Sequence, residues 1–255
     1  MRSVLTTLTM AWREAWSNRA SFWMGVIIMV VNDLVWVLFW VLTMRSIDDI
    51  NGWGFDQIIL LQAVFMTGAG FSLGVLANVR SIPELIISGG LDSFLSLPVS
   101  TLAHVVVRKV LPVHVGDLVF GILLFALLGN PTPARVMVFS IAVLCSSAVI
   151  TGFLIVSGSL TFFLGRPEAS ESSFVALLMF ANYPIDVFSG LIKLTLYVIV
   201  PVAFVSSVPA TIVDEFDATS LAMLVSVSLG MMVAASSIFR LGLRRYTSGA
   251  GWTTA

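Results

Sequence analysis

Long apolar runs alternate with short polar segments along the whole chain, and their lengths predict helices that cross a membrane. About 20 apolar residues, at a rise of roughly 1.5 Å each, cover a bilayer core about 30 Å thick. Runs near this length lie at residues 22–43, 57–78, 110–128, 135–164, 172–189 and 219–240. The sequence therefore predicts an all-α polytopic membrane protein with six transmembrane helices, in a single domain covering residues 1–255.

The segment before the first run has a different pattern. Leu5, Leu8, Trp12 and Trp16 recur three or four residues apart, and arginines lie between them. An amphipathic helix of this kind lies flat in the membrane interface, so we expect residues 1–21 to form an interfacial helix. A secretory signal is the competing interpretation, but the apolar run that follows is long and lacks a small-residue cleavage pattern.

Polar residues interrupt the apolar pattern at residues 81–98, where we expect a short helical element lying flat on the membrane. Ser81 and Glu84 form a capping-box pattern, and Pro83 stands in the first turn, where its missing N–H costs nothing. A glycine pair that ends at Gly90 is expected to stop this helix.

A second helical stretch follows the glycines. Leu91 and Leu95 fall on one face with Asp92 on the other, until Pro98 ends the run. Basic residues on both sides place the segment at a cytoplasmic surface. Because it lies between two membrane spans, such an element is what a soluble partner would push on.

Prolines break the apolar pattern after residue 180. Tyr183 and Pro184 are followed by a second apolar run that is interrupted at Pro201 and again at Pro209. Two full spans here would place the end of the chain on the wrong side, so we expect a fifth span followed by an external re-entrant hairpin at residues 190–213. Non-helical backbone at membrane depth is tolerated only beside protein or a water-filled cavity, so the break indicates a pathway.

The distribution of basic residues predicts the orientation. With the N-terminus inside, external segments hold only Arg45, Arg135 and Lys193 of the thirteen lysines and arginines. Cytoplasmic segments of membrane proteins carry an excess of basic residues. Both termini are therefore expected in the cytoplasm, although the rule alone does not exclude a different even number of spans.

Composition agrees with a membrane protein and excludes several other classes. Hydrophobic residues make up 58% of the chain and charged residues 11%, against roughly 25% charged residues in soluble domains. The single cysteine excludes an internal disulfide and a multi-cysteine metal site. The formal net charge of −1 gives no reason to expect a nucleic-acid partner.

We expect no catalytic residues in this chain. It has no glycine-rich phosphate loop followed by Lys-Ser or Lys-Thr, no metalloprotease pattern around its two histidines, and no Gly-Xaa-Ser-Xaa-Gly motif. Intramembrane catalysis and a scaffolding role remain as alternatives to transport.

Ionisable residues inside the apolar runs are candidates for a transport pathway, because such groups usually face a bundle interior or water. Asp33 lies in the middle of the first run, and His114 and Asp117 share a face of the third. Asp186 and Lys193 are seven residues apart, so they would share a face and pair if a helix continued across Gly190. A polar or cation-attracting passage is the functional interpretation. Interhelical hydrogen bonding, or placement at the membrane interface, is the structural alternative.

Three segments resemble the ABC-2 type permeases, in particular a subgroup of about 260 residues. They are GGLDSFLSLPVS at 89–100, YPIDVFSGLIKLTLYVIVPVAFVSSVPA at 183–210 and FRLGLRRYTSGAG at 239–251. The order of the predicted elements also resembles the plan of this family, and the resemblance covers essentially the whole chain. Leu97 departs from it, because relatives often place a basic residue there.

The resemblance implies that the chain is a permease subunit of an ATP-binding-cassette exporter in a bacterial plasma (inner) membrane. Two separate ATPase subunits would bind ATP and Mg, so this chain itself needs no cofactor, and a second permease, expected to be non-identical, would complete the membrane part. The substrate would be a hydrophobic or cationic small molecule that leaves the cytoplasm or inner leaflet. Lipid or glycolipid export, and a non-transporting scaffold surrounded by membrane lipid, are the alternatives.

The resemblance also assigns roles to residues. Coupling to the ATPase would fall to Glu84, Gly90, Leu91, Asp92, Leu95 and Pro98. The substrate pathway or gate would include Asp33, His114, Asp117, Tyr183, Pro184, Asp186, Lys193 and Pro201. Closure of the ATPases would press on the coupling helix and shift the spans, and the hairpin would then open outward.

Overall fold

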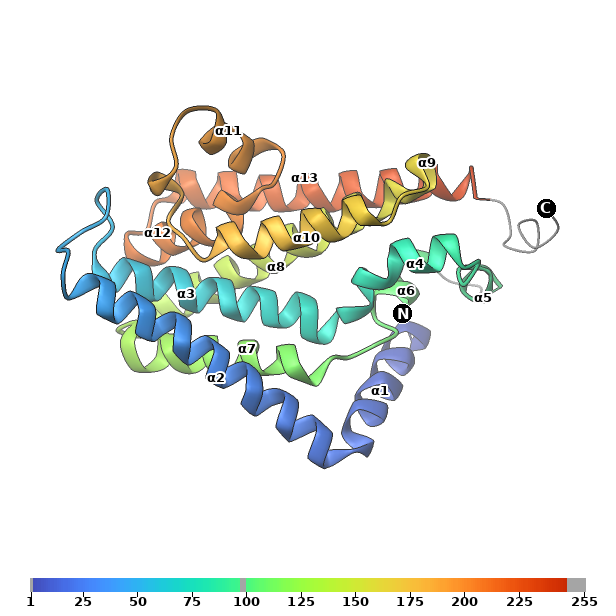
Figure 1. Ribbon diagram of the computed structural model, residues 1–255, viewed down its shortest axis with the longest axis horizontal. Coiled ribbons are helices and arrows are strands. Elements are labelled where there is room, and N and C mark those ends of the chain that lie inside the picture. The colour runs from blue at the N-terminus through green and yellow to red at the C-terminus, as the bar shows by residue number, and fades with distance from the viewer. Residues whose placement is uncertain (1, 97–99, 247–255) are drawn as a thin grey trace.

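A computed structural model describes residues 2–96 and 100–246, and every regular element in these residues is a helix. Their one extended pairing is an isolated bridge between Ile50 and Trp53. The predicted all-α class is therefore confirmed. Figure 1 shows long helices running side by side, with α1, α4, α5 and α6 gathered at one end of the bundle.

Within the described residues, four helices are long and apolar enough to cross a membrane. They are α2 (Arg19–Met44), α3 (Phe55–Gly70) with its π-helical continuation to Val75, α8 (Pro133–Ser159) with α9 (Thr161–Leu164), and α13 (Ala218–Leu243). They correspond to the first, second, fourth and sixth predicted spans. The chain is thus a multi-pass membrane protein.

The helices at the third and fifth predicted spans are shorter. Helix α7 (Pro112–Leu128) has 17 residues and α10 (Glu168–Ala181) has 14. At roughly 1.5 Å per residue, α10 is shorter than a bilayer core. It ends well before the predicted bound of 189, because Pro184 has no N–H to continue the helix and disfavours helical backbone in the residue before it.

The predicted hairpin region is a bent pair of helices. Helix α11 (Gly190–Val198) is followed by a π-helical segment (Ala203–Ser207) that continues into α12 (Val208–Asp214), and the two parts meet at 65°. Pro201 lies between them, where its ring interrupts the helical hydrogen bonds. This geometry is that of a broken span or a re-entrant loop.

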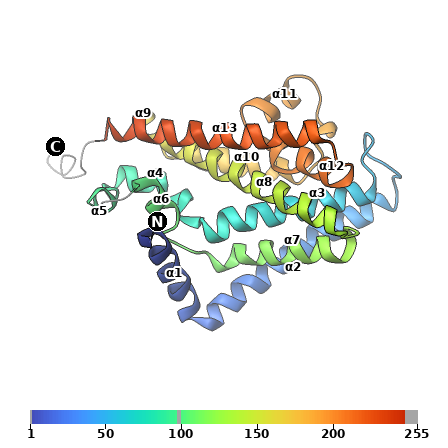
Figure 2. The same ribbon diagram turned by 180° about the vertical axis from the view of Figure 1, so that it is seen from behind.

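The N-terminal helix α1 (Arg2–Ser17) ends earlier than the predicted residue 21. Asn18 leaves helical geometry and its side chain accepts a hydrogen bond from the Ser21 N–H at 3.1 Å, which caps the start of α2. The buried Ala11 of α1 packs into a cluster with Phe22 and Val26 of α2. Figure 2 shows α1 at a sharp angle to α2 from behind.

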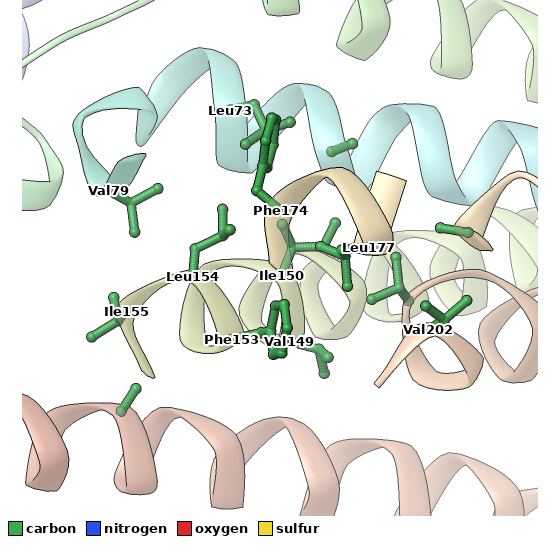
Figure 3. Packing of buried hydrophobic residues seen from close by; sticks show 14 of the residues in the cluster. Leu73, Val79, Val149, Ile150, Phe153, Leu154, Ile155, Phe174, Leu177 and Val202 are labelled. Atoms are coloured by element: carbon green, nitrogen blue, oxygen red, sulfur yellow. The ribbon is translucent and has the colours of Figure 1, made fainter. Parts of the chain in front are cut away.

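Helix α8 forms the centre of the larger hydrophobic core. Its buried side chains include Val149, Ile150 and Phe153, and they meet Phe174 and Leu177 of α10 (Figure 3). Because α8 contacts α3, α10, α12 and α13, it fixes the positions of the elements around it.

Two π-helical segments are hydrogen-bonded to adjacent residues of α8. The Ser72 hydroxyl, in the segment Phe71–Val75, donates to the Ser147 carbonyl at 2.9 Å. The Ser146 hydroxyl donates to the carbonyl of Val205, in the other π segment, at 2.6 Å. The small polar residues of α8 thus serve helix packing here.

Glycines let α7 approach its neighbours closely. A methyl group at Gly70 of α3 would overlap the Leu118 backbone of α7, and one at Gly116 of α7 would lie 2.8 Å from the Val26 carbonyl oxygen of α2. Helix α7 is therefore held between α2 and α3 with backbone nearly touching backbone, as in other small-residue membrane contacts.

Candidate functional site

Two carboxyl groups meet inside the bundle at the contact between α2 and α7. Asp33 of α2 is 3% exposed and Asp117 of α7 is 5% exposed, and their carboxyl groups lie in hydrogen-bonding contact. The neighbouring Gly116 makes this meeting geometrically feasible, because any larger residue there would push α7 away from α2. The structure thus brings together two residues that sequence analysis had placed on separate runs.

His114 completes a chain of three ionisable side chains. Its Nδ1 atom lies 2.8 Å from Oδ2 of Asp117, one turn along α7. On the other side of the pair, the Oδ2 atom of Asp33 is buried without a hydrogen-bond partner. A buried carboxylate oxygen without a partner is costly, so this site has unused capacity for a positive or hydrogen-donating group.

A cavity of about 210 Å³ opens beside the acid pair. Four helices line it, α2, α3, α7 and α10, and its wall is mostly apolar. Besides the three ionisable groups, the lining comprises Met29, Asn32, Trp36, Phe65, Met66, Ala69, Leu73, Leu178, Met179 and Asn182. An apolar pocket with a few convergent polar groups is the usual form of a small-molecule site.

Aromatic rings join this cavity to the start of the hairpin region. The ring of Tyr183 lies 6.0 Å from that of Trp36 and 5.8 Å from that of Trp40, both edge to face. Pro184 follows directly and turns the chain away from α10. Tyr183 thus connects the start of the hairpin region to Trp36 in the cavity wall.

Asp186 ties the hairpin to the loop before α3. Its carboxylate accepts a hydrogen bond from Lys193 Nζ at 2.7 Å and from Trp53 Nε1 at 2.8 Å, and its backbone carbonyl accepts one from the Asn51 amide at 2.8 Å. The expected pair with Lys193 is formed. A helix continuing across Gly190 was the wrong reason for it, because Gly190 has φ +58° and α11 starts there.

Arg135 and Asp214 form a second tie that sequence analysis missed. The guanidinium donates to the Asp214 carboxylate at 2.9 Å, and Gln57 of α3 donates to the same carboxylate at 3.0 Å. The sequence places both charged residues in polar segments on one side of the membrane but contains no local spacing that pairs them.

The predicted coupling segment forms two short helices, in agreement with the helical stretches expected before and after the glycine pair. Helix α4 (Ile82–Ile87) and α5 (Asp92–Leu95) are separated by a turn in which Gly89 has φ +76°. The capping box of Ser81 and Glu84 is wrong, because Ser81 closes a 3₁₀ turn and its side chain makes no cap hydrogen bond.

The side chains of this segment divide into an anchor and an outer face. Leu91 is fully buried, whereas Glu84, Asp92 and Leu95 are exposed. Leu95 therefore does not share the buried face that its spacing from Leu91 predicted. Pro98 lies outside the described residues.

Tyr246, which sequence analysis did not single out, lies against this segment. Burial and the neighbouring Asp92 carboxylate raise the pKa of Tyr246 to about 12, and its ring meets Phe162 at 6.1 Å, edge to face. Tyr246, just beyond α13, thus contacts the coupling segment.

Arg80 was also missed as an anchor. Its guanidinium lies 3.8 Å over the ring of Phe174 and 3.2 Å from the Glu171 carboxylate. These contacts join the start of the coupling segment to α10, a helix that also lines the cavity. The only local signal was a lone arginine at the end of an apolar run.

The described residues offer no cluster of three His, Cys, Asp or Glu side chains suited to a metal ion. A family model described as "ABC-2 family transporter protein" matches residues 27–250. No curated protein and no solved structure matches the chain. The acid pair, the hairpin and the coupling segment all fall within the matched range.

Proposed function

The chain belongs to the ABC-2 family of transporter proteins, and from this membership we propose that it is the membrane subunit of an ABC exporter. Its substrate would be a hydrophobic or cationic small molecule taken from the cytoplasm or inner leaflet. Members of this family are generally the non-catalytic membrane subunit and associate with ABC ATPases. In this proposal two such ATPases and a second, non-identical permease complete the transporter.

The cavity beside Asp33 and Asp117 is the observation that carries the substrate part of this proposal. Its apolar wall suits a hydrophobic body, and its buried carboxyl groups suit a positive charge. Burying an acidic pair inside a membrane protein costs free energy, and such pairs usually have a function. This supports a transport role over plain packing.

The coupling segment supports the proposed ATPase interface. Glu84, Asp92 and Leu95 form an outward face, while Leu91 fixes that face to the core. Pressure on this face would pass through Arg80 to α10 and through Tyr246 to the end of α13. Both routes lead to helices that flank the cavity or the hairpin.

The bent helices α11 and α12 are the proposed external gate. Asp186 and Asp214 hold the two ends of this region to the loop before α3 and to α8. Opening would require at least one of these charged contacts to rearrange. In this proposal the chain has six spans, which include α7 and α10, and both termini lie in the cytoplasm of a bacterial plasma membrane.

The placement of charges supports that orientation. Arg80 precedes α4, Arg166 follows α9, and Arg240 and Arg244 lie at the end of α13. Figure 1 shows α4, α5, α9 and this end of α13 at the same end of the bundle. Such an excess of basic residues marks the cytoplasmic side.

Lipid or glycolipid export is the second candidate. A separate groove of about 550 Å³ between α3, α7 and α8 has an almost wholly apolar wall, which includes Phe71, Ile122 and Val143. Such a groove would accept an acyl chain. A non-transporting scaffold would need neither the groove nor the acid pair.

Purification of the tagged chain from its native membrane, followed by mass spectrometry, tests the proposal. An ABC ATPase should accompany the wild-type chain and be lost from a variant that combines Asp92→Lys and Leu95→Asp. A matched control combines Leu164→Asp with Glu168→Lys, which makes the same types of change at exposed positions of the same bundle end. Undiminished ATPase recovery with the first variant would refute the assigned interface, and recovery of the wild-type chain without any ATPase would favour the scaffold.

A further inference from the structure

The acid pair can hold a proton between its two carboxyl groups. Asp33 and Asp117 are nearly fully buried, and their carboxyl groups lie in contact. Two carboxylates in contact cannot both be ionised at low cost in free energy. In the absence of a ligand, one proton between the two oxygens relieves their repulsion. The pair then carries a single negative charge.

In the described lining of the cavity, few groups could balance that charge. Among the described residues that line the cavity, α2 adds only the amide of Asn32, and α3 and α10 add apolar side chains and the amide of Asn182. Among the described lining residues, His114 of α7 is the only basic group, and its Nδ1 atom contacts Asp117. A cation that enters the cavity would be the strongest positive charge beside Asp33.

From this arrangement we infer that an organic monocation binds at the Asp33–Asp117 pair in exchange for the shared proton, with His114 as the proton acceptor. This inference rests on the proposed transport function and adds the substrate's charge and its stoichiometric exchange for a proton. The positive charge of the ligand stabilises the second carboxylate, so the proton is no longer needed between the oxygens.

The three side chains provide a route for the displaced proton. Asp117 Oδ2 faces His114 Nδ1 at 2.8 Å, so the proton passes to Nδ1, and the imidazolium then releases a proton from Nε2 to water. His114 lies in the first turn of α7, after the segment that joins α6 (Thr101–Val106) to α7. One proton leaves for each cation bound, and the total charge in the cavity is unchanged.

The wall of the cavity defines the kind of cation. Met29, Met66 and Met179 provide soft apolar contacts, and Trp36 provides an aromatic face. After the proton has left, the carboxylates can only accept hydrogen bonds, so the ligand needs positive charge but no acceptor of its own. A small aromatic quaternary ammonium ion fits a cavity of about 210 Å³.

Isothermal titration calorimetry of the full chain with benzyltrimethylammonium tests this inference. Titrations at pH 7 in phosphate and in Tris, whose ionisation enthalpies differ, report the protons released per cation bound. We expect about one proton per cation in the wild type, and no comparable competition from neopentylbenzene, the neutral compound of the same shape.

Three variants make the test specific. Asp33→Asn and Asp117→Asn should each abolish proton release and weaken binding by about tenfold or more, because one carboxylate is lost. Asp56→Asn, which removes an exposed carboxylate in the first turn of α3, should behave like the wild type. His114→Gln should retain binding but slow the proton release seen with a pH indicator in stopped flow.

Each result bears on the exchange directly. Binding of the cation without proton release in the wild type would overturn it, and so would an Asp33→Asn variant with unchanged binding. Failure of the wild-type chain to bind the cation, while it still recovers its ATPase, would overturn this inference and leave the proposed function intact. Failure to recover any ATPase with the purified wild-type chain would instead contradict the proposed function.

Discussion

Replacing Gly116 with alanine should force α2 and α7 apart at the acid pair. The added methyl carbon would lie 2.8 Å from the Val26 carbonyl oxygen and 2.9 Å from Met29 Cβ. Ordinary contacts of this kind are about 3.5 Å, so the helices must separate by roughly half an ångström or more. The obstacle is backbone and the first side-chain carbon, which cannot move aside by a change of rotamer.

The expected cost follows from two opposing effects. Overpacking of a close contact destabilises by about 1–3 kcal/mol, and removal of a glycine from a helix interior stabilises by about 0.5–1 kcal/mol. A net loss of about 1–2 kcal/mol remains. For a chain of this size, that loss lowers the thermal midpoint by roughly 2–8 °C.

Gly230→Ala is the matched control. Gly230 also lies inside a long helix, α13, but a methyl group there would have no atom within 4 Å. This substitution should leave the thermal midpoint unchanged or raise it slightly, because only the glycine effect operates.

Thermal midpoints in one detergent, read from the monodisperse fraction after heating, provide the comparison. Gly116→Ala should also weaken benzyltrimethylammonium binding, since Asp117 moves with α7. An equal fall in midpoint for both variants would show that the close contact at Gly116 does not carry the effect. An unchanged midpoint and unchanged binding for Gly116→Ala would refute the reasoning from helix separation.

Three further substitutions test other contacts. Asp186→Ala leaves the buried Trp53 Nε1 without its acceptor, so limited proteolysis should cut the loop at 45–54 faster than in Asp186→Asn, which keeps an acceptor. Asp217→Ala should destabilise at pH 7, because hydrogen bonds from the hydroxyl and backbone of the first turn of α13 lower the pKa of Asp217 below its usual 3.8; this stability is present above pH 3.8 and is lost as the pH falls through the lowered pKa, so the difference in thermal midpoint should shrink from pH 5 to pH 3. Tyr246→Phe should remove the component near pH 12 from the phenol absorbance titration, and an unchanged titration would contradict the raised pKa of Tyr246.

The sequence predicted the helical class and most of the long helices because apolar length is a local property. The apolar run 135–164, for example, needs no partner to identify it as a span, and α8 with α9 covers nearly the same residues. Pro201 likewise predicts a break in any helix that contains it. These predictions depend only on residues that are close together in the sequence.

Contacts between distant runs could not be predicted in the same way. Asp33 and Asp117 were each recognised as unusual, but the glycine that lets them meet, Gly116, is ordinary in an apolar run. The expected capping box failed for a related reason: Ser81 has the correct spacing to Glu84, but the preceding turn had already fixed its backbone. The spacing of residues in the sequence shows which of them could interact. Which of them do interact depends on how the helices pack in the folded structure.

The two π-helical segments are both anchored at the same place on α8. The segment Phe71–Val75 precedes the coupling helices, and the segment Ala203–Ser207 lies within the hairpin. Both are hydrogen-bonded to adjacent serines of α8, Ser147 and Ser146. A π turn holds one residue more than an α-helical turn and is frequent at functional sites. Because both segments bond to adjacent residues of α8, a displacement of either segment would act on the same part of this helix.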